Sequence, residues 1–313
     1  MTYLIPLPGR TDRLDIVEPN STSVQRALRR EGLAAYEPST VTTLLTLFDR
    51  TANLAFFDAG ANMVLYALPC AAIFDPEHVH AFEQTPETVE VMQNAVRANR
   101  LDIDVIACAL GDTDTTAELH LSSVSDSSNS LVKGFKQSVG TVIVPVRRLD
   151  THVDSTGVAP NVMKIDVETF EPAVLAGAID TIATHRPYIV IEVLHRRGHD
   201  HGDEITEVMD PFGYHYYRLD EASTWRAEPR ITGSRTGADR DWLLAPEPLD
   251  GDFGVSWDDW RSKLRACGPE RNSRVPIGRS VLVALRRGGP TEVVATARRY
   301  VAALRRERGR TPN

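Results

Sequence analysis

Four acidic residues stand at the ends of short apolar runs and are the strongest candidates for a chemical role. They are Asp58, Glu83, Asp166 and Glu192. Short apolar runs are typical of buried strands, and ligands of an open parallel sheet bind beyond the carboxyl ends of its strands. A carboxylate there can accept hydrogen bonds from hydroxyl groups, act as a general base or bind a cation. These four residues are therefore the first candidates for a binding edge.

The first of these ends continues as Asp58-Ala59-Gly60-Ala61-Asn62. Gly60 allows the backbone to approach a ligand, and Asn62 offers a donor and an acceptor; the alternative is a tight turn without a ligand. Glu83 follows 25 positions after Asp58, where a carboxylate can bind both hydroxyls of a ribose. Together the two ends favour an adenosine-containing cofactor, and the missing G-x-G-x-x-G pattern disfavours a nicotinamide dinucleotide.

The elements that must position these residues alternate from about residue 53 to 246. Apolar runs alternate with segments of helical periodicity, which is typical of βαβ units around a parallel sheet. Helices are expected after Pro86 and, as one helix, from Pro172 to about His185, while 122–130 and 230–240 are expected to be polar loops. The expected strands are 54–57, 79–83, 104–108, 162–166, 189–193, 214–219 and 242–245.

Composition and charge limit the class of protein. The 313 residues are 42% hydrophobic and 25% charged, which excludes a chain that is disordered throughout. No apolar run is long enough to span a membrane and the first residues lack a signal-peptide pattern, so we expect a cytoplasmic protein. Three cysteines without metal-like spacing indicate neither a disulfide framework nor a zinc site. The net charge of −8 combines an acidic body with a basic segment over 261–313, and a body of that charge disfavours nucleic-acid binding.

Five segments in series resemble the FkbM-type S-adenosylmethionine-dependent methyltransferases. They are FDAGAN at 57–62, VHAFE at 79–83, ALGD at 109–112, KIDVE at 164–168, and RP at 186–187 with IEV at 191–193. The resemblance implies an α/β class I methyltransferase (Rossmann-like) fold, with a seven-stranded, mostly parallel sheet, helices on both faces and an antiparallel last strand. It also implies S-adenosylmethionine as cofactor, S-adenosylhomocysteine as product and, usually, O-methylation of a sugar or natural-product hydroxyl.

Carried over to this chain, the resemblance assigns cofactor-binding residues. It places Asp58, Gly60 and Asn62 around the methionine part of the cofactor, Glu83 on the ribose, and Ala109 and Leu110 beside the adenine.

Three positions depart from the family pattern. Related sequences commonly have glycine at Val64, proline at Gln84 and glycine at Thr169. A β-branched side chain is strained at positive φ. We therefore expect Val64 to begin the first helix of the domain with ordinary helical angles.

Catalysis of methyl transfer to an alcohol requires a positioned acceptor and benefits from a general base. His195, three residues after Glu192, is the leading candidate because histidine titrates near neutral pH; the alternative is a solvated loop histidine. Asp166 ends a buried strand, where its carboxylate needs a polar cleft or a partner, and Lys164 on the same sheet face is the expected partner. Asp166, Glu192 and His195 are thus the catalytic candidates.

The same carboxylates allow another interpretation. Asp166, Glu168 and Glu192 have the oxygen ligands that a divalent cation prefers, but they serve equally well as acceptors for substrate hydroxyls. No residue is therefore assigned as a metal ligand. Tyr36-Glu37 either reaches the acceptor side or caps a helix.

The ends of the chain lie outside the alternating pattern. Residues 1–50 predict an N-terminal helical cap, 51–248 the cofactor-binding methyltransferase domain, and 249–313 a C-terminal extension that closes with a basic amphipathic helix and is a candidate surface for homo-oligomerisation. Trp257 and Trp260 either stack on a ring-shaped substrate or belong to the core or a subunit contact. The stretch 122–130 is either a lid or a loose loop.

The sequence therefore predicts an S-adenosylmethionine-dependent O-methyltransferase. Its partner is a small polar acceptor, a sugar or secondary metabolite, with no nucleic acid and no membrane. The alternatives are N-methylation of an amino sugar and a non-catalytic scaffold or regulator with the same fold.

Overall fold

The computed structural model describes residues 2–17, 21–122, 129–132, 138–196, 198–220, 225–236 and 239–267. These residues all belong to the first of two units, Met1–Pro269. The expected basic closing helix and most of the stretch 122–130 lie outside the described residues. No helix in the described ranges is both long and apolar enough to cross a bilayer.

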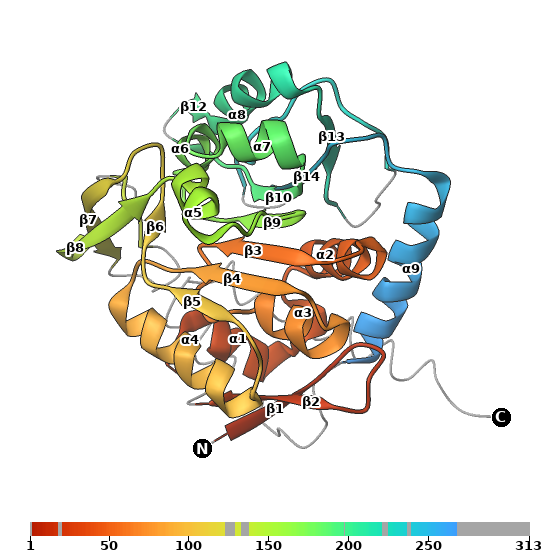
Figure 1. Ribbon diagram of the computed structural model, residues 1–313. Helices are drawn as coiled ribbons and strands as arrows, with labels where there is room; N and C mark the ends of the chain where they lie inside the picture. Colours follow the sequence, from red (N-terminus) through yellow and green to blue (C-terminus); the bar gives the residue numbers. More distant parts are fainter. Residues whose placement is uncertain are drawn as a thin grey trace, which may run out of the picture. The chain divides into compact units, whose positions relative to one another are not determined.

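A seven-stranded sheet forms the centre of the fold (Figure 1). Its order is β13-β14-β10-β9-β3-β4-β5, and β14 runs antiparallel to both of its neighbours while the other pairs are parallel. All seven expected strands are confirmed with small shifts at their ends. They are β3 (Ala55–Ala59), β4 (His78–Phe82), β5 (Asp104–Ile106), β9 (Val162–Ile165), β10 (Tyr188–Glu192), β13 (His215–Arg218) and β14 (Asp241–Ala245).

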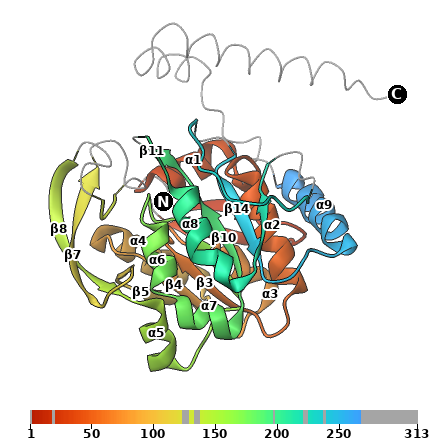
Figure 2. The same cartoon turned by 90° about the horizontal axis from the view of Figure 1, so that it is seen from above.

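Side chains alternate between the two faces of this sheet and form two separate cores. Phe56 packs in one core and its neighbour Phe57 in the other, as do Leu243 and Leu244 on β14. The first core is covered by α2 (Pro38–Arg50), α3 (Ala67–Phe74), α4 (Pro86–Asn99) and α9 (Gly251–Ala266). The second is covered by α5 (Leu149–Thr156), α6 (Glu171–Ala176), α7 (Ile179–His185) and α8 (His201–Met209), as Figures 1 and 2 show.

The N-terminal segment contains a β-hairpin that the sequence interpretation missed. β1 (Thr2–Pro6) pairs with β2 (Arg13–Val17), and the hairpin packs against α4 through two hydrogen bonds between Asp15 and Asn99. The expected helices follow as α1 (Ser23–Glu31), the short η1 (Leu33–Ala35) and α2. Thr22 begins α1 with a reciprocal capping box to Gln25.

The expectation of one helix from Pro172 to His185 is wrong, because the chain breaks between α6 and α7. Gly177 ends α6, and a Cβ at this position would lie 1.9 Å from the carbonyl oxygen of Gly111. Only glycine therefore fits at this position, where the backbone of Gly111 packs against the end of α6.

A second, three-stranded sheet in the order β6-β8-β7 was also not expected. It consists of β6 (Ala109–Leu110), β7 (Thr115–Ser122) and β8 (Ser138–Arg147), and it lies at the edge of the fold in both views. Two shorter elements, β11 (His195–Arg196) and β12 (His199–Asp200), form a small hairpin after β10. The short 3-10 helix η3 (Asp210–Phe212) directly follows α8.

The two tryptophans of α9 belong to the core. Trp257 Nε1 donates to Thr43 Oγ1 at 3.0 Å and Trp260 Nε1 donates to Asp49 Oδ2 at 3.1 Å, so both rings are held against α2. Both side chains are buried. This packing leaves neither ring available for stacking on a substrate.

Candidate active site

The Gly60 turn and the end of β4 meet in space, as the sequence predicts. The N–H of Gly60 donates to the carbonyl of Phe82 at 3.0 Å. One oxygen of Glu83 accepts the N–H of Asn62 at 3.1 Å, and the other accepts the N–H of Thr85 at 2.8 Å. These two bonds orient the buried carboxylate, and each of its oxygens keeps a lone pair for a further donor.

Gly60 also brings β3 against β9. Its φ is 78°, and a Cβ here would lie 1.9 Å from the carbonyl oxygen of Asp166. The N–H of Asp166 donates to Ala59 O at 3.0 Å. A side chain at position 60 would therefore separate the turn from Asp166, which explains why the position requires glycine.

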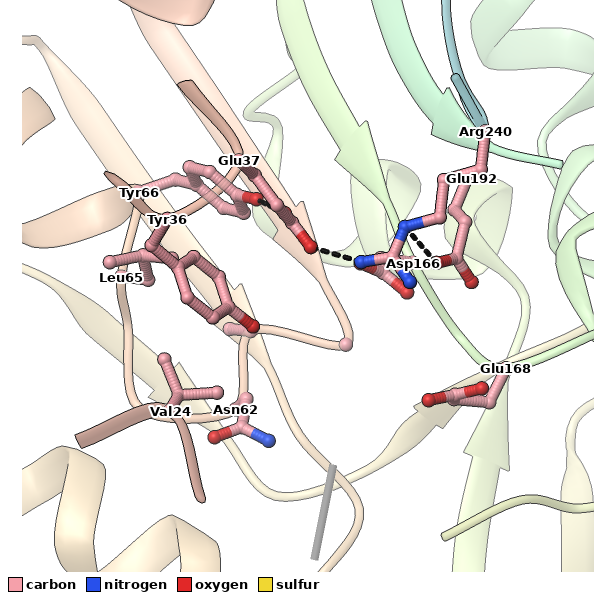
Figure 3. Close-up of a pocket in the computed structure, with 12 residues that line it drawn as sticks. Val24, Tyr36, Glu37, Asn62, Leu65, Tyr66, Asp166, Glu168, Glu192 and Arg240 are labelled. Carbon is pink, nitrogen blue, oxygen red and sulfur yellow. Dashed lines mark hydrogen bonds and ion pairs between the residues drawn. The ribbon is translucent and has the colours of Figure 1, made fainter. Parts of the chain in front are cut away.

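A cavity of about 230 Å³ lies at the carboxyl ends of β3, β9 and β10 (Figure 3). Four of the predicted site residues line it, namely Gly60, Asn62, Asp166 and Glu192. The full lining consists of Val24, Tyr36, Glu37, Gly60, Ala61, Asn62, Leu65, Tyr66, Asp166, Glu168, Glu192 and Arg240.

The guanidinium of Arg240 lies at the cavity wall between the carboxylates of Glu37 and Glu192 (Figure 3). Its Nε lies 2.9 Å from Glu192 Oε1, and its guanidinium also pairs with Glu37. Tyr66 donates its hydroxyl proton to the other oxygen of Glu37. Glu37 occupies the N-cap position of α2 but makes no side-chain capping bond, so its side chain serves the cavity rather than the helix.

Lys164 is the partner of Asp166, as predicted. Its side chain is fully buried, and Nζ lies 3.3 Å from Asp166 Oδ2 and 3.6 Å from Asp241 Oδ1. Burial alone would lower the pKa of Lys164, but the charges of Asp166, Asp241, Glu37 and Glu192 outweigh it and raise that pKa. Lys164 is therefore a fixed positive charge beneath the cavity.

The environments of Asp166 and Glu192 shift their pKa values in opposite directions. Burial would raise the pKa of Asp166, but Lys164 and Arg240 hold it below its usual range. Burial, followed by the charge of Asp166, raises the pKa of Glu192 well above its usual range despite Arg240. Asp166 is thus the ionised member of the pair, while Glu192 retains its proton to higher pH.

The other predicted residues, Glu83 among them, do not line the cavity. Asp58 is buried beside Lys164 on the neighbouring strand, and burial raises its pKa to about 7. Ala109 and Leu110 are buried in β6. His195 lies on β11, outside the cavity lining, with its Nδ1 3.5 Å from Asp200 Oδ2. The structure therefore does not bring His195 together with Asp166 and Glu192.

Tyr36-Glu37 reaches the cavity, whereas Tyr66 and Arg240 were not predicted. Tyr66 follows Asn62 by four residues and Arg240 immediately precedes β14, in a stretch interpreted as a polar loop. A signal was present for Arg240, because it directly precedes the strand expected to be antiparallel, and the start of an antiparallel strand lies beside the carboxyl ends of its parallel neighbours.

The expectation that Val64 takes ordinary helical angles is wrong. Its φ is 56°, and α3 begins only at Ala67. Thr169 also has a positive φ, 78°. Both β-branched residues therefore stand in left-handed backbone, a conformation that favours glycine. Val64 is buried in the first core and does not line the cavity.

Three features define the class I methyltransferase fold. They are the strand order, the antiparallel strand β14 in an otherwise parallel sheet, and the glycine turn that faces an acid at the end of the next strand. The Methyltransferase FkbM domain model matches residues 58–218. The chain belongs to this family of methyltransferases. None of the curated proteins compared matches it.

Similar solved structures include three methyltransferase-fold proteins. Methyltransferase FkbM from Methylobacillus flagellatus KT is 19% identical with a TM-score of 0.43, and the match covers 65% of this chain and 47% of that chain. Fibrillarin from Aeropyrum pernix, with natively bound S-adenosylmethionine, is 13% identical with a TM-score of 0.41 and coverages of 78% and 100%. Magnesium protoporphyrin IX methyltransferase from Synechocystis PCC 6803, with bound S-adenosylmethionine, is 12% identical with a TM-score of 0.38 and coverages of 71% and 84%. This chain thus spans about half the length of the Methylobacillus protein.

Proposed function

We propose that this protein transfers the methyl group of S-adenosylmethionine to a hydroxyl of a small, polar acceptor, a sugar or secondary metabolite. The observation that carries the proposal is the meeting of the Glu83–Asn62 corner with Asp166 at one edge of the sheet. Membership of the FkbM family supports the same reaction class.

The residues present fit the proposed cofactor. Glu83 is oriented by two backbone N–H groups and can accept ribose hydroxyls with its remaining lone pairs. The Oδ1 atom of Asn62 is buried and has no hydrogen-bond partner within the described ranges, which suits an ammonium or hydroxyl donor. Gly60 and Asn62 would hold the methionine part, with Ala109 and Leu110 beside the adenine. Asp58 would support this corner from beneath.

When bound, the cofactor supplies a methyl group that its sulfonium already activates, so the protein mainly positions the acceptor. We assign the general base to Asp166, because its side chain lines the cavity, is partly exposed and is held ionised by Lys164. Glu192 supports it as a neighbouring acid. This assignment does not use His195, which lies outside the cavity lining.

The charge of the cavity indicates the class of acceptor. Its lining includes the acids Glu37, Asp166, Glu168 and Glu192 with Arg240 as a basic residue. Asp166 is the ionised carboxylate of this lining, and it disfavours an anionic acceptor beside it. A neutral polyhydroxylated acceptor can donate hydrogen bonds to these carboxylates, and we therefore expect an acceptor rich in hydroxyl groups.

The proposal is tested by assaying purified protein with labelled S-adenosylmethionine and matched pairs of sugars that carry a hydroxyl or an amine at one position. Methylation of the hydroxyl sugar supports the proposal, while exclusive methylation of the amine supports amino-sugar N-methylation. Calorimetry with S-adenosylmethionine and S-adenosylhomocysteine addresses the scaffold alternative, since absent affinity for both would contradict any methyltransferase function.

A further inference from the structure

A second cluster of polar side chains lies outside the cavity, on the β11–β12 hairpin and the first turn of α8. His199 begins β12, His201 begins α8, and Glu204 follows three residues later. One ligand atom from each of these three residues lies within 4.8 Å of the others. The proposed methyl transfer uses none of them.

The distances within this cluster match those of a metal site. His199 Nε2 lies 2.9 Å from Glu204 Oε1, and His201 Nδ1 lies 3.5 Å from Glu204 Oε2. Ligand atoms at about 2.1 Å from a tetrahedral zinc ion are about 3.4 Å apart. The two nitrogen–oxygen distances, each to a different oxygen of Glu204, are therefore close to this value, and small side-chain movements within the 4.8 Å cluster would bring the three ligands around one ion.

Two of the ligands remain available. The side chains of His199 and Glu204 are more than two-fifths exposed, whereas Nδ1 of His201 is buried and has no hydrogen-bond partner in the part of the chain that the structure describes.

The backbone holds the two histidines on either side of a fixed residue. Asp200 caps α8 by accepting the N–H of Gly202 at 2.9 Å, and it also accepts the N–H of Gly233 at 2.6 Å. A Cβ at Gly202 would lie 2.6 Å from the carbonyl oxygen of Ile231. The helix start is thus locked against the following loop, so the ligand positions are organised before any ion arrives.

We propose that His199, His201 and Glu204 form a binding site for a transition-metal ion of the Zn²⁺ class, with the remaining coordination position open to solvent. Two imidazoles and one carboxylate are a ligand set typical of zinc, whereas Mg²⁺ prefers oxygen ligands alone. The sequence offered no cysteine pattern for zinc, and the histidine pattern H-x-H-x-x-E supplies it instead.

The ion would clamp the hairpin to α8. The hairpin follows β10, which ends at Glu192 in the cavity wall, and it carries His195, whose Nδ1 faces Asp200 at 3.5 Å. A bound ion would therefore stiffen the β11–β12 hairpin, which follows the strand that ends in the cavity wall. The proposed site does not depend on the identity of the methyl acceptor.

The test uses the full chain, without an affinity tag and stripped of metal with a chelator. Titration with Co²⁺ is expected to produce the visible absorption of a four-coordinate site, and Zn²⁺ should displace the Co²⁺ while Mg²⁺ does not. The variants His199→Gln and Glu204→Gln should each weaken Zn²⁺ binding by at least tenfold. His185→Gln, which changes an exposed histidine at the end of α7, should bind Zn²⁺ like the wild type.

Equal Zn²⁺ affinity in the wild type, His199→Gln and Glu204→Gln would overturn the proposal, as would an equal loss in His185→Gln. Both outcomes are independent of methyl transfer. Circular dichroism of the metal-free variants confirms that each is folded, and the double variant His199→Gln/His201→Gln provides a second measurement on the same ligands.

Discussion

Two polar clusters lie on the same central sheet. One contains ionised side chains in ion pairs, and the other contains two neutral histidine rings. At the carboxyl edge, Lys164 and Arg240 are ionised and paired with acidic residues around a cavity. Inside the second core, His80 on β4 and His152 on α5 contact each other through His80 Nδ1 and His152 Nε2 at 2.9 Å, with the ring of Phe57 stacked on His80.

Burial lowers the pKa of both histidines, and the hydrogen bonds of the pair fit two neutral rings. His80 Nε2 lies 3.3 Å from Asp104 Oδ2, so this nitrogen carries the proton and His80 Nδ1 is the acceptor. His152 then donates from Nε2, and its buried Nδ1 has no hydrogen-bond partner among the described residues. A proton added to His152 would create a charge without a counterion.

This difference assigns the edge cluster to catalysis or binding and the histidine pair to the stability of the fold. The edge cluster keeps its charges because opposite charges and a cavity compensate for their burial, whereas the core pair is tolerated only as neutral rings. Changes at the edge should therefore act on catalysis or binding, and changes at the histidine pair should act on the pH dependence of unfolding.

The largest effect is expected for Asp166→Asn. Loss of the base should lower kcat by about 10²- to 10⁴-fold, with a smaller change in affinity for S-adenosylhomocysteine. Asp241→Asn is the matched control, because Asp241 also pairs with Lys164 but does not line the cavity. Assays of methyl transfer and urea unfolding should show a larger fall in kcat for Asp166→Asn; an equal fall in both variants would assign Asp166 a structural role only.

Acid should destabilise the protein through His152. Burial, followed by the nearby His80, lowers the pKa of His152 to about 4, against about 6.5 in the unfolded chain. The neutral ring's contribution is complete above pH 6.5 and is lost as the pH falls towards 4, which amounts to about 3 kcal/mol.

Urea unfolding between pH 7 and pH 4 measures this loss. The variant His152→Leu should show a smaller pH dependence, since it has no ring to protonate, while the exposed His185→Leu should resemble the wild type. An unchanged pH dependence in His152→Leu would contradict the neutral-pair interpretation.

Glu83→Gln tests an acid that is held by backbone N–H groups rather than by a counterion. Burial raises the pKa of Glu83, although its bonds to Thr85 and Asn62 oppose this. Loss of charged hydrogen bonds to the ribose should weaken S-adenosylhomocysteine binding by about 2 kcal/mol, or roughly thirtyfold, in calorimetry. The exposed Glu90→Gln on α4 is the control, and comparable affinities for the two variants would place the nucleoside elsewhere.

The smallest effect concerns the two strained positions near the cavity. Thr169 is buried with a φ of 78°, and its Oγ1 has no partner within the described ranges. Thr169→Gly should therefore raise the free energy of unfolding by about 1 kcal/mol. Val64→Gly relieves similar strain but removes a fully buried side chain, so it should not stabilise; a larger gain for Val64→Gly in urea unfolding would contradict this assignment.

Most of the central sheet could be predicted because its strands are buried on both faces and appear as continuous apolar runs. The hairpin β1–β2 and the sheet β6-β8-β7 were missed, since β7 is half exposed and carries no continuous apolar run. At the break between α6 and α7, Gly177 packs closely against the backbone of Gly111, which is 66 positions earlier in the sequence. No local pattern contains that contact.

The candidate site divides in the same way. The sequence alone determined the glycine turn, the acidic strand ends and the Lys164–Asp166 pair, because period-two alternation and strand ends are local properties of the chain. Only the tertiary structure decided that Glu37, Tyr66 and Arg240 complete the cavity, that His195 lies outside its lining, and that Val64 and Thr169 take positive φ. These features arise from packing between segments distant in sequence, where the compensation of buried charge and the close approach of backbones set the geometry.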